Sequence, residues 1–412
     1  MGVTLSFRPS GALVGVLVAL IIVAGVAGYF AGSTATPAQT ITTTVTVTAG
    51  APGVATTVTE KVTETITKTV TASPTPEKVY RWRMAAHVPA GDPRYDLDVY
   101  FVNLVKNMSG GRLIIELYPG GELFPVPQTF DMVSKGVVEM AEVFFGYWVA
   151  EDPVMALASS IPGPLTTPDD VRYLWLKTQD IIRKRVEARG VVLLGPLGMT
   201  PTEIVFSRKP ISSVEDLKGL IIRSAGISAK FYEELGLKVV TLTAGEVYTA
   251  LQLGTIDAAE WGEYEGSYKM GFAEVAKYVL EPPPGYSIHS EAYVDNFVIV
   301  NPQAWAELPD DLKAIVLAAI DATYTWAINR MYFQAALKGK ELWIKEGATI
   351  TTLPVKEARK LMDVAVKIYV DLAKQSPDAL EFIKRFITVC RDLGYSGWAE
   401  AIENGLKSAG LI

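Results

Sequence analysis

The stretch ISAKFYEELGLKVVTLTAGEVYTALQLGTIDAAEW, residues 227–261, decides the fold class, because two helix-and-strand pairs follow each other in it. An amphipathic helix is predicted to end at Gly236, and the β-branched run KVVTL then continues as a strand. A second helix is predicted to reach Gly254, and TIDAAEW follows as another short strand. Alternation of helices and strands is typical of α/β folds, in which neighbouring strands pair in parallel.

The same alternation is present nearer the N-terminus. Three strands are predicted there, namely VYRWRMAAHV (79–88), RLIIELYPGGEL (112–123) and VEMAEVFF (138–145), and helical patterns separate them. Residues 191–211 contain two further strand candidates, whereas residues 301–412 are dominated by long amphipathic runs with few turn signals. We therefore predict an α/β fold with a helix-rich C-terminal part, beginning near residue 79.

The first 32 residues predict a membrane anchor or a signal segment. The run from Gly11 to Gly32 carries no charge, and about 22 residues at 1.5 Å each are enough to cross a bilayer core of roughly 30 Å. Arg8 precedes the run, so the positive-inside rule places the short N-terminus inside and the rest of the chain outside the cell membrane. The small residues of AGSTATPA leave a cleavable signal peptide as the alternative.

Residues 33–78 are predicted to form a Thr-rich stalk or linker. Thr, Val, Ala and Pro dominate them, and such a composition buries too little apolar surface to pack alone. Apolar residues recur every four positions, so part of the segment is a candidate helix that associates with a second copy of itself; they are Val54, Val58, Val62, Ile66 and Val70. The high content of β-branched residues argues against a stable isolated helix.

Composition excludes several functions. The net charge of −7 and the pI near 5.2 disfavour nucleic acid as a partner, because binding to the phosphate backbone needs a basic face. The single cysteine, Cys390, is predicted to be a small buried hydrophobe, and it excludes an internal disulfide or a cysteine metal cluster. Glycine-rich phosphate loops and the HExxH motif are absent from the sequence.

Four carboxylates lie close to Trp261 in the sequence, namely Asp257, Glu260, Glu263 and Glu265. They are compatible with a catalytic acid pair, with a metal site or with a solvated loop. Two other functions therefore stay open beside ligand binding. One is a metal-assisted surface hydrolase that uses Glu260 and Glu263, and the other is a stalked structural protein of the cell envelope.

The order of several segments resembles the solute-binding proteins of tripartite ATP-independent periplasmic (TRAP) transporters, the DctP type. The resemblance covers residues 80–395 and is carried by GGRLIIELYPGGEL, VSKGVVEMAEV, FGYWVAEDP, SSVEDLKGLIIRSAG, FYEELGLKVVTLTAGEVYTALQLGTIDAAEW, KYVLEPPPG and NPQAWAELPDDLKAIV. DAAEW looks most like the branch that binds 2-oxoacids and hydroxyacids. The implied fold is two-lobed and periplasmic-binding-protein-like, with lobe I at about 79–200, lobe II at about 201–290, and both completed by parts of 291–412.

The resemblance implies a transport function without catalysis. Such a protein captures a small organic acid, here a 2-oxoacid, hydroxyacid or sugar acid, outside the cytoplasm and presents it to two membrane subunits. The stalk and anchor are not part of the usual family pattern, so an extracytoplasmic protein tethered by its N-terminal helix is expected. The C-terminal helical region resembles segments that pair two copies in the oxoacid branch, which implies a homodimer.

The resemblance also implies a binding site. Arg223, which matches the arginine of the GLKIR strand, grips the carboxylate of the ligand with its planar fork. Trp261 offers its backbone carbonyl to a cation and its ring to the pocket wall, and Glu291, aided by Glu260, completes the cation site. Oxygen ligands favour Na⁺ or Ca²⁺, which would bridge protein and ligand.

Two further positions of the predicted site match the family pattern less closely. Thr202 stands where the oxoacid branch has a glutamine that touches both cation and ligand, so the hydroxyl of Thr202 is a shorter substitute. An aromatic residue of FGYWV, either Tyr147 or Trp148, matches the ring that closes lobe I over the ligand.

Overall fold

The computed structural model describes residues 39–51, 54–66, 78–165, 167–201, 204–242, 244–281, 283 and 292–412. The chain divides into two compact units, Met1–Lys78 and Val79–Ile412. The division falls at the position where the sequence changes from stalk-like to globular composition.

The described part of the N-terminal unit is a β-hairpin. Strands β1 (Gln39–Ala51) and β2 (Val54–Ile66) pair antiparallel, with Ala51 opposite Val54 at the turn. The candidate helix with a four-residue repeat is therefore wrong over Val54–Ile66, because β-branched residues favour the extended backbone. The predicted anchor lies outside the described residues, and none of the helices in the described ranges is long and apolar enough to cross a bilayer.

Lobe I is built on a five-stranded mixed sheet with the order β4-β3-β5-β12-β6. Its strands are β3 (Tyr80–Ala85), β4 (Leu113–Tyr118), β5 (Met140–Val143), β6 (Val192–Pro201) and β12 (Ala292–Val300). β3 is parallel to β4 and β5, as the intervening helices predict, whereas β12 is antiparallel to β5 and β6. Successive residues of β12 enter two different hydrophobic cores, so both faces of this sheet are buried.

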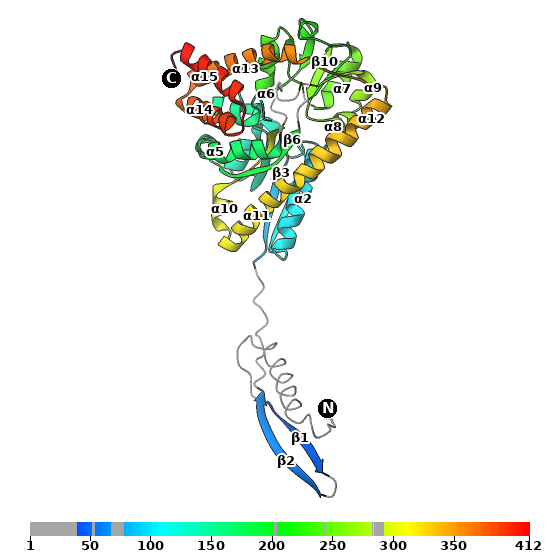
Figure 1. Cartoon of the computed structure of the whole chain (residues 1–412), viewed down its shortest axis with the longest axis vertical. Helices are drawn as coiled ribbons and strands as arrows, with labels where there is room; N and C mark the ends of the chain where they lie inside the picture. The colour runs from blue at the N-terminus through cyan, green and yellow to red at the C-terminus, as the bar shows by residue number, and fades with distance from the viewer. Residues whose placement is uncertain are drawn as a thin grey trace. The chain divides into compact units, whose positions relative to one another are not determined.

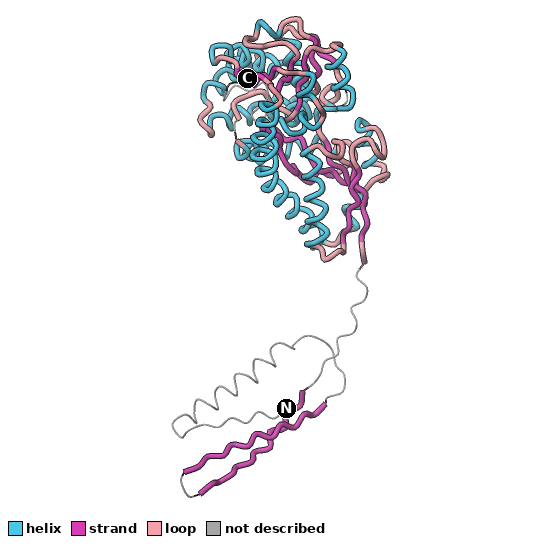
Figure 2. The backbone as a smooth tube through the Cα atoms, turned by 90° about the vertical axis from the view of Figure 1, so that its right-hand side faces the viewer, coloured by secondary structure: helices cyan, strands magenta, loops and turns pink. Residues whose placement is uncertain are grey.

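Helices cover both faces of the lobe I sheet. One face packs against α2 (Pro93–Met108) and α11 (Asp310–Ala327), and the opposite face packs against α3 (Thr129–Ser134), α4 (Pro153–Ser159) and α5 (Pro168–Glu187). Two short 3₁₀ turns, η1 (Val126–Gln128) and η2 (Phe145–Trp148), complete the lobe. Figure 2 shows the helices of this unit flanking the strands.

Lobe II is built on a six-stranded sheet with the order β13-β11-β7-β10-β8-β9. Its strands are β7 (Ile204–Ser207), β8 (Ile221–Arg223), β9 (Lys238–Val240), β10 (Ala258–Trp261), β11 (Tyr278–Glu281) and β13 (Thr349–Thr352). Its helical elements are η3 (Glu215–Leu217), α6 (Gly226–Glu234), α7 (Ala244–Leu253), α8 (Tyr264–Lys269) and α9 (Phe272–Val275). The stretch 227–261 thus forms α6-β9-α7-β10, and β8 is parallel to both β9 and β10, which confirms the predicted α/β layout.

One long helical segment connects the two lobes (Figure 1, yellow to orange). It follows α10 (Pro302–Glu307) and consists of α11, the π-helix η4 (Ile328–Lys338) and α12 (Gly339–Lys345). Val316 of α11 is buried in the core of lobe I, whereas Trp343 of α12 is buried in lobe II, where it stacks on Phe206 with ring centroids 4.4 Å apart. The π-helix lies between these two anchors, and its wider turn changes the direction of the side chains that follow.

The C-terminal part forms the helices α13 (Val355–Gln375), α14 (Pro377–Asp392) and α15 (Ser396–Ser408). They pack against one another and against α5 and α6, and their apolar faces belong to the core that both lobes share. Cys390 is fully buried there, as predicted for a small hydrophobe. The homodimer through this region stays a prediction.

Candidate functional site

Arg223 ends β8 at the edge where the parallel strands of lobe II finish, which is the usual place for ligands in α/β sheets. Arg223 as a whole is 8% exposed; its Nε donates to the Leu242 carbonyl (3.1 Å) and its Nη1 to the Glu260 carbonyl (3.0 Å). The guanidinium carbon lies 4.5 Å from the centroid of the Trp261 ring. Arg223 forms no ion pair within the described residues, and a buried cation without an anion is costly. A ligand carboxylate would complete it.

β10 brings Glu260 and Trp261 to the same edge. Glu260 is 1% exposed, and its carboxylate accepts a hydrogen bond from the Ser224 hydroxyl. Trp261 packs edge-to-face on Phe272 with the centroids 5.9 Å apart, and its buried Nε1 has no hydrogen-bond partner in the part of the chain that the structure describes. The predicted residues Arg223, Glu260 and Trp261 thus lie together.

Lobe I reaches the same tryptophan through the first turn of α2. Asp92 is the N-cap of this helix; it accepts from the Arg94 backbone N–H at 2.9 Å and from the Arg94 Nη2 at 2.7 Å. Burial alone would raise the pKa of Asp92, but the adjacent Arg94 outweighs it, and the pKa is lowered. The Arg94 guanidinium lies 5.8 Å from the Trp261 ring centroid. Asp92 and Arg94 were not predicted, although an Asp-Pro pair at the start of a helix is a visible N-cap signal.

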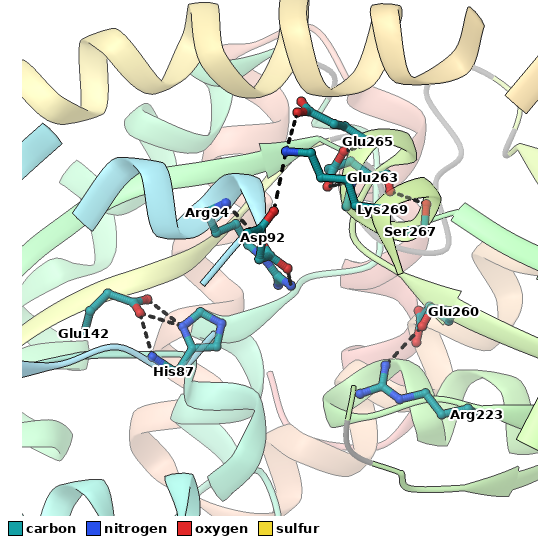
Figure 3. Close-up of polar contacts among 12 residues, drawn as sticks. His87, Asp92, Arg94, Glu142, Arg223, Glu260, Glu263, Glu265, Ser267 and Lys269 are labelled. Carbon is teal, nitrogen blue, oxygen red and sulfur yellow. Dashed lines mark hydrogen bonds and ion pairs between the residues drawn. The ribbon is translucent and has the colours of Figure 1, made fainter. Parts of the chain in front are cut away.

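A buried histidine and glutamate form a second pair in lobe I. His87 Nδ1 lies 2.7 Å from each carboxylate oxygen of Glu142, and the His87 backbone N–H donates to Glu142 Oε2 at 3.1 Å. Their side chains are 2% and 0% exposed. His87 Nε2 is buried and makes no hydrogen bond within the described residues. Figure 3 shows Glu142 on one side of the ring, and Arg94 and Arg223 beyond the other side.

The structure separates the two aromatic candidates of η2. Trp148 is 4% exposed and packs edge-to-face on Phe130 in the core, with the centroids 4.7 Å apart. Tyr147 is 40% exposed and lies edge-on to His87 at 6.4 Å. Although the residue is partly exposed, desolvation of the hydroxyl raises the pKa of Tyr147, and the charges of Arg223 and Arg94 oppose the rise. Tyr147 thus lies beside His87 and Phe144 with its ring partly exposed, whereas Trp148 supports the core.

Glu263 caps a helix and does not pair with Glu260. Its carboxylate accepts from the Glu265 N–H at 2.5 Å and from the Gly266 N–H at 2.8 Å, so it is the N-cap of α8. Burial and the nearby charge of Asp92 raise the pKa of Glu263 to about 8. A carboxyl of lobe II thus lies close to a carboxylate of lobe I.

An arginine of the π-helix links the lobes. Arg330 Nε donates to Asp96 of α2 at 2.8 Å, and Arg330 Nη1 donates to Glu265 of α8 at 2.7 Å. Burial would lower the pKa of Arg330, but the two carboxylates raise it. Lys269 adds an ion pair to Glu265 at 2.8 Å. Glu265 is therefore used in an interlobe contact (Figure 3 shows its pairing with Lys269).

Two of the predicted site residues, Thr202 and Glu291, lie outside the described residues. Within the described ranges, no three His, Cys, Asp or Glu side chains gather as a metal cluster. Glu260 alone supplies a buried carboxylate beside Arg223, and a hard cation accepts such an oxygen. The separate hydrogen-bond partners of Glu260 and Glu263 do not form the acid pair that the hydrolase alternative requires.

Two α/β lobes that meet around a buried arginine define a ligand-binding protein of the two-lobed type. Residues 84–376 match the model of the bacterial extracellular solute-binding protein family 7, DctP. The chain is 30% identical over 302 residues to a monocarboxylate 2-oxoacid-binding periplasmic protein of Nostoc sp.. The aligned region covers 72% of this chain and 79% of that protein. The chain belongs to this family of TRAP solute-binding proteins.

Solved structures support the same fold. A TRAP transporter solute-binding protein of Bordetella bronchiseptica, described with copurified calcium and picolinate, is 25% identical and has a TM-score of 0.68, covering 81% of this chain and 97% of that one. A TRAP periplasmic solute-binding protein of Colwellia psychrerythraea with bound calcium and pyruvate is 24% identical and has a TM-score of 0.69, covering 81% of this chain and 100% of that one. The two-lobed fold implied by the sequence is confirmed.

Proposed function

We propose that the chain is the extracytoplasmic solute-binding subunit of a TRAP-type secondary transporter and that it captures a small organic acid. The observation that carries this proposal is the buried guanidinium of Arg223, which two backbone carbonyls hold in place and which no described carboxylate neutralises. A planar guanidinium fixed in this way binds a carboxylate through parallel charge-assisted hydrogen bonds. Trp261 and Tyr147 would enclose the ligand from lobe II and lobe I, and Trp148 would support Tyr147 from the core.

A cation is proposed beside the carboxylate. The buried Glu260 carboxylate offers the kind of oxygen ligand that a hard cation such as Na⁺ or Ca²⁺ prefers. The Trp261 carbonyl and Glu291 would complete the ligand set, and Thr202 would reach the ligand or the cation. The calcium described for the Bordetella relative supports this arrangement.

Capture would work by closure of the two lobes. The ligand touches Arg223 of lobe II and Tyr147 of lobe I, so it binds the closed state better than the open one and shifts the equilibrium toward closure. The π-helix η4 lies where the connecting helix passes between the lobes, and Arg330 holds one acid of each lobe. Binding without turnover is the activity that this arrangement supports.

The position in the cell is part of the proposal. The uncharged run at residues 11–32 would anchor the protein in the cytoplasmic membrane, with the stalk and the solute-binding unit outside. Membrane subunits of the transporter would receive the ligand there. Pairing of two copies through the C-terminal helices remains a further expectation from the family.

The test combines ligand identification with one substitution. Native mass spectrometry of the purified full chain is expected to reveal a copurified acid, and calorimetric titration then measures its affinity. Arg223→Lys keeps the charge but loses the fork, so we expect the affinity to fall about tenfold to a hundredfold. Arg208→Lys is the matched control, because Arg208 is an exposed arginine of the same lobe that packs beside Gly254. Equal affinity of the wild type and Arg223→Lys would refute the assignment of the site.

A further inference from the structure

His87 and Glu142 are placed together by strand pairing. β3 and β5 are parallel, with Ala85 opposite Ala141, so the residues that follow the two strands leave the sheet side by side. Glu142 is completely buried and contacts both the backbone N–H and Nδ1 of His87. In such a buried pair the hydrogen bond between Nδ1 and the carboxylate is made within the protein, and Nε2 is left for another partner.

Glu142 determines which ring nitrogen carries the proton. A carboxylate only accepts hydrogen bonds, so Nδ1, at 2.7 Å from both oxygens, must be the donor. If Nε2 also carried a proton, a charged N–H would be buried without a partner, which costs more than an unused lone pair. The hydrogen-bond pattern therefore assigns a neutral ring whose Nε2 is an acceptor.

The free side of the ring lies on the lobe I side of the proposed site. Phe144 and Tyr147 lie beside it, with ring centroids 6.0 and 6.4 Å from that of His87. The end of β8 comes close to these aromatic residues, because a Cβ added at Gly226, three residues after Arg223, would lie 3.8 Å from the Phe144 ring. Tyr147 is 40% exposed and its side chain makes no hydrogen bond with the described residues, and rotation of its ring would give a ligand access to Nε2.

We propose that His87 Nε2 accepts a hydrogen bond from a hydroxyl of the ligand, and that the protein therefore prefers 2-hydroxy acids to 2-oxo acids. This inference rests on the proposed function, because it needs the carboxylate of the same ligand on Arg223. A hydroxyl next to the carboxylate can donate to Nε2. An oxo group is itself an acceptor, so its lone pair would face the lone pair of Nε2. Glu142 is the positioning residue that sets this preference through the ring.

Lactate and pyruvate are the probes, because they share one carbon skeleton and differ only in hydroxyl against oxo. For the purified full chain we expect lactate to bind about tenfold more tightly than pyruvate, since one ligand satisfies a buried acceptor and the other does not. In Glu142→Gln the amide N–H can donate to Nδ1, so the ring proton moves to Nε2 and the preference is expected to reverse. A ratio of the two affinities that is the same in both proteins would overturn the inference.

A second variant serves if Glu142→Gln folds poorly. His87→Asn keeps a donor toward Glu142, because the asparagine amide nitrogen occupies the place of Nδ1, but it removes Nε2. The advantage of lactate over pyruvate is then expected to vanish. A retained advantage of lactate would also overturn the inference.

The tautomer is measured directly by nitrogen NMR, because the chain contains only two histidines. In the ligand-free protein the His87 ring is expected to show a protonated Nδ1 and an unprotonated Nε2; a protonated Nε2 would contradict the inference. The proposed function fails separately. If native mass spectrometry finds no copurified acid and the wild type binds neither probe, both proposals fall. Binding that requires Arg223 but ignores Glu142 leaves the proposed function intact and overturns the hydroxy-acid preference.

Discussion

Glu263→Gln should change how the stability of the protein depends on pH. The Glu263 side chain is 2% exposed, caps α8, and lies near Asp92 of the other lobe. Burial and the repulsion by Asp92 raise its pKa from the usual 4.5 to about 8. The folded protein therefore holds a proton on Glu263 at pH values at which the unfolded chain has lost it. Glutamine has the shape of the protonated acid and cannot titrate.

The sign and size follow from proton linkage. The folded state binds more protons than the unfolded state between pH 4.5 and about 8, so the free energy of unfolding falls as the pH rises through this window. The difference in pKa corresponds to about 5 kcal/mol when the carboxyl is fully ionised. Glutamine can serve only one of the two capping N–H groups with its oxygen, which costs about 1 kcal/mol at every pH. The variant should be slightly less stable at pH 5 and more stable by several kcal/mol at pH 9.

Urea unfolding at pH 5, 6, 7, 8 and 9, followed by tryptophan fluorescence, measures this difference. All eight tryptophans lie within residues 79–412, so the signal reports on the two-lobed unit alone. Glu233→Gln is the control, because Glu233 is exposed on α6. If the wild type and Glu263→Gln lose stability in parallel from pH 5 to pH 9, the assignment of a protonated, interlobe Glu263 is refuted.

Two further predictions concern the π-helix and the helix that follows it. Arg330→Ala removes the bridge between Asp96 and Glu265 and should lower the free energy of unfolding by about 2–3 kcal/mol. It should also increase the radius of gyration of the ligand-free protein in small-angle X-ray scattering. An unchanged radius would contradict a bridging role. Gly339→Ala should cost about 1–3 kcal/mol in urea unfolding, because the added Cβ would lie 2.4 Å from the Glu265 backbone nitrogen. The control Gly245→Ala meets open space in α7 and should stabilise the protein by about 0.5–1 kcal/mol; equal effects of the two substitutions would refute the packing argument.

Local patterns were enough to predict most of the α/β layout. In residues 227–261 a glycine follows each helix and β9 is rich in β-branched residues, and the structure has α6, β9, α7 and β10 there. The antiparallel strand β12 and the π-helix η4 were not predicted. β12 pairs with strands far away in the sequence. Such features depend on tertiary packing, which a local pattern does not contain.

Site residues at the end of a single strand were predicted from the sequence, whereas the residues that two neighbouring strands bring together were not. Arg223 and Trp261 each end a strand in a recognisable segment. The structure places the guanidinium carbon of Arg223 4.5 Å from the centroid of the Trp261 ring. His87 and Glu142 are separated by 55 residues and meet only because β3 and β5 are parallel neighbours. Neither residue carries a motif, so their pairing follows from sheet topology alone. Prediction of the lobe I half of the site therefore required the strand order first.

The four carboxylates near Trp261 differ in what they already bind, and this difference argues for capture over catalysis. Asp257 accepts from a backbone N–H at 3.0 Å and pairs with a lysine at 2.6 Å, Glu263 caps α8, and Glu265 pairs with the arginine of the π-helix. Each of these three stabilises a strand, a helix end or the contact between the lobes. Glu260 differs because it lies buried beside the guanidinium that holds its own backbone carbonyl. One buried carboxylate beside a guanidinium, with the other three acids in structural contacts, suits the binding of an anion together with a cation better than proton transfer between two carboxyls.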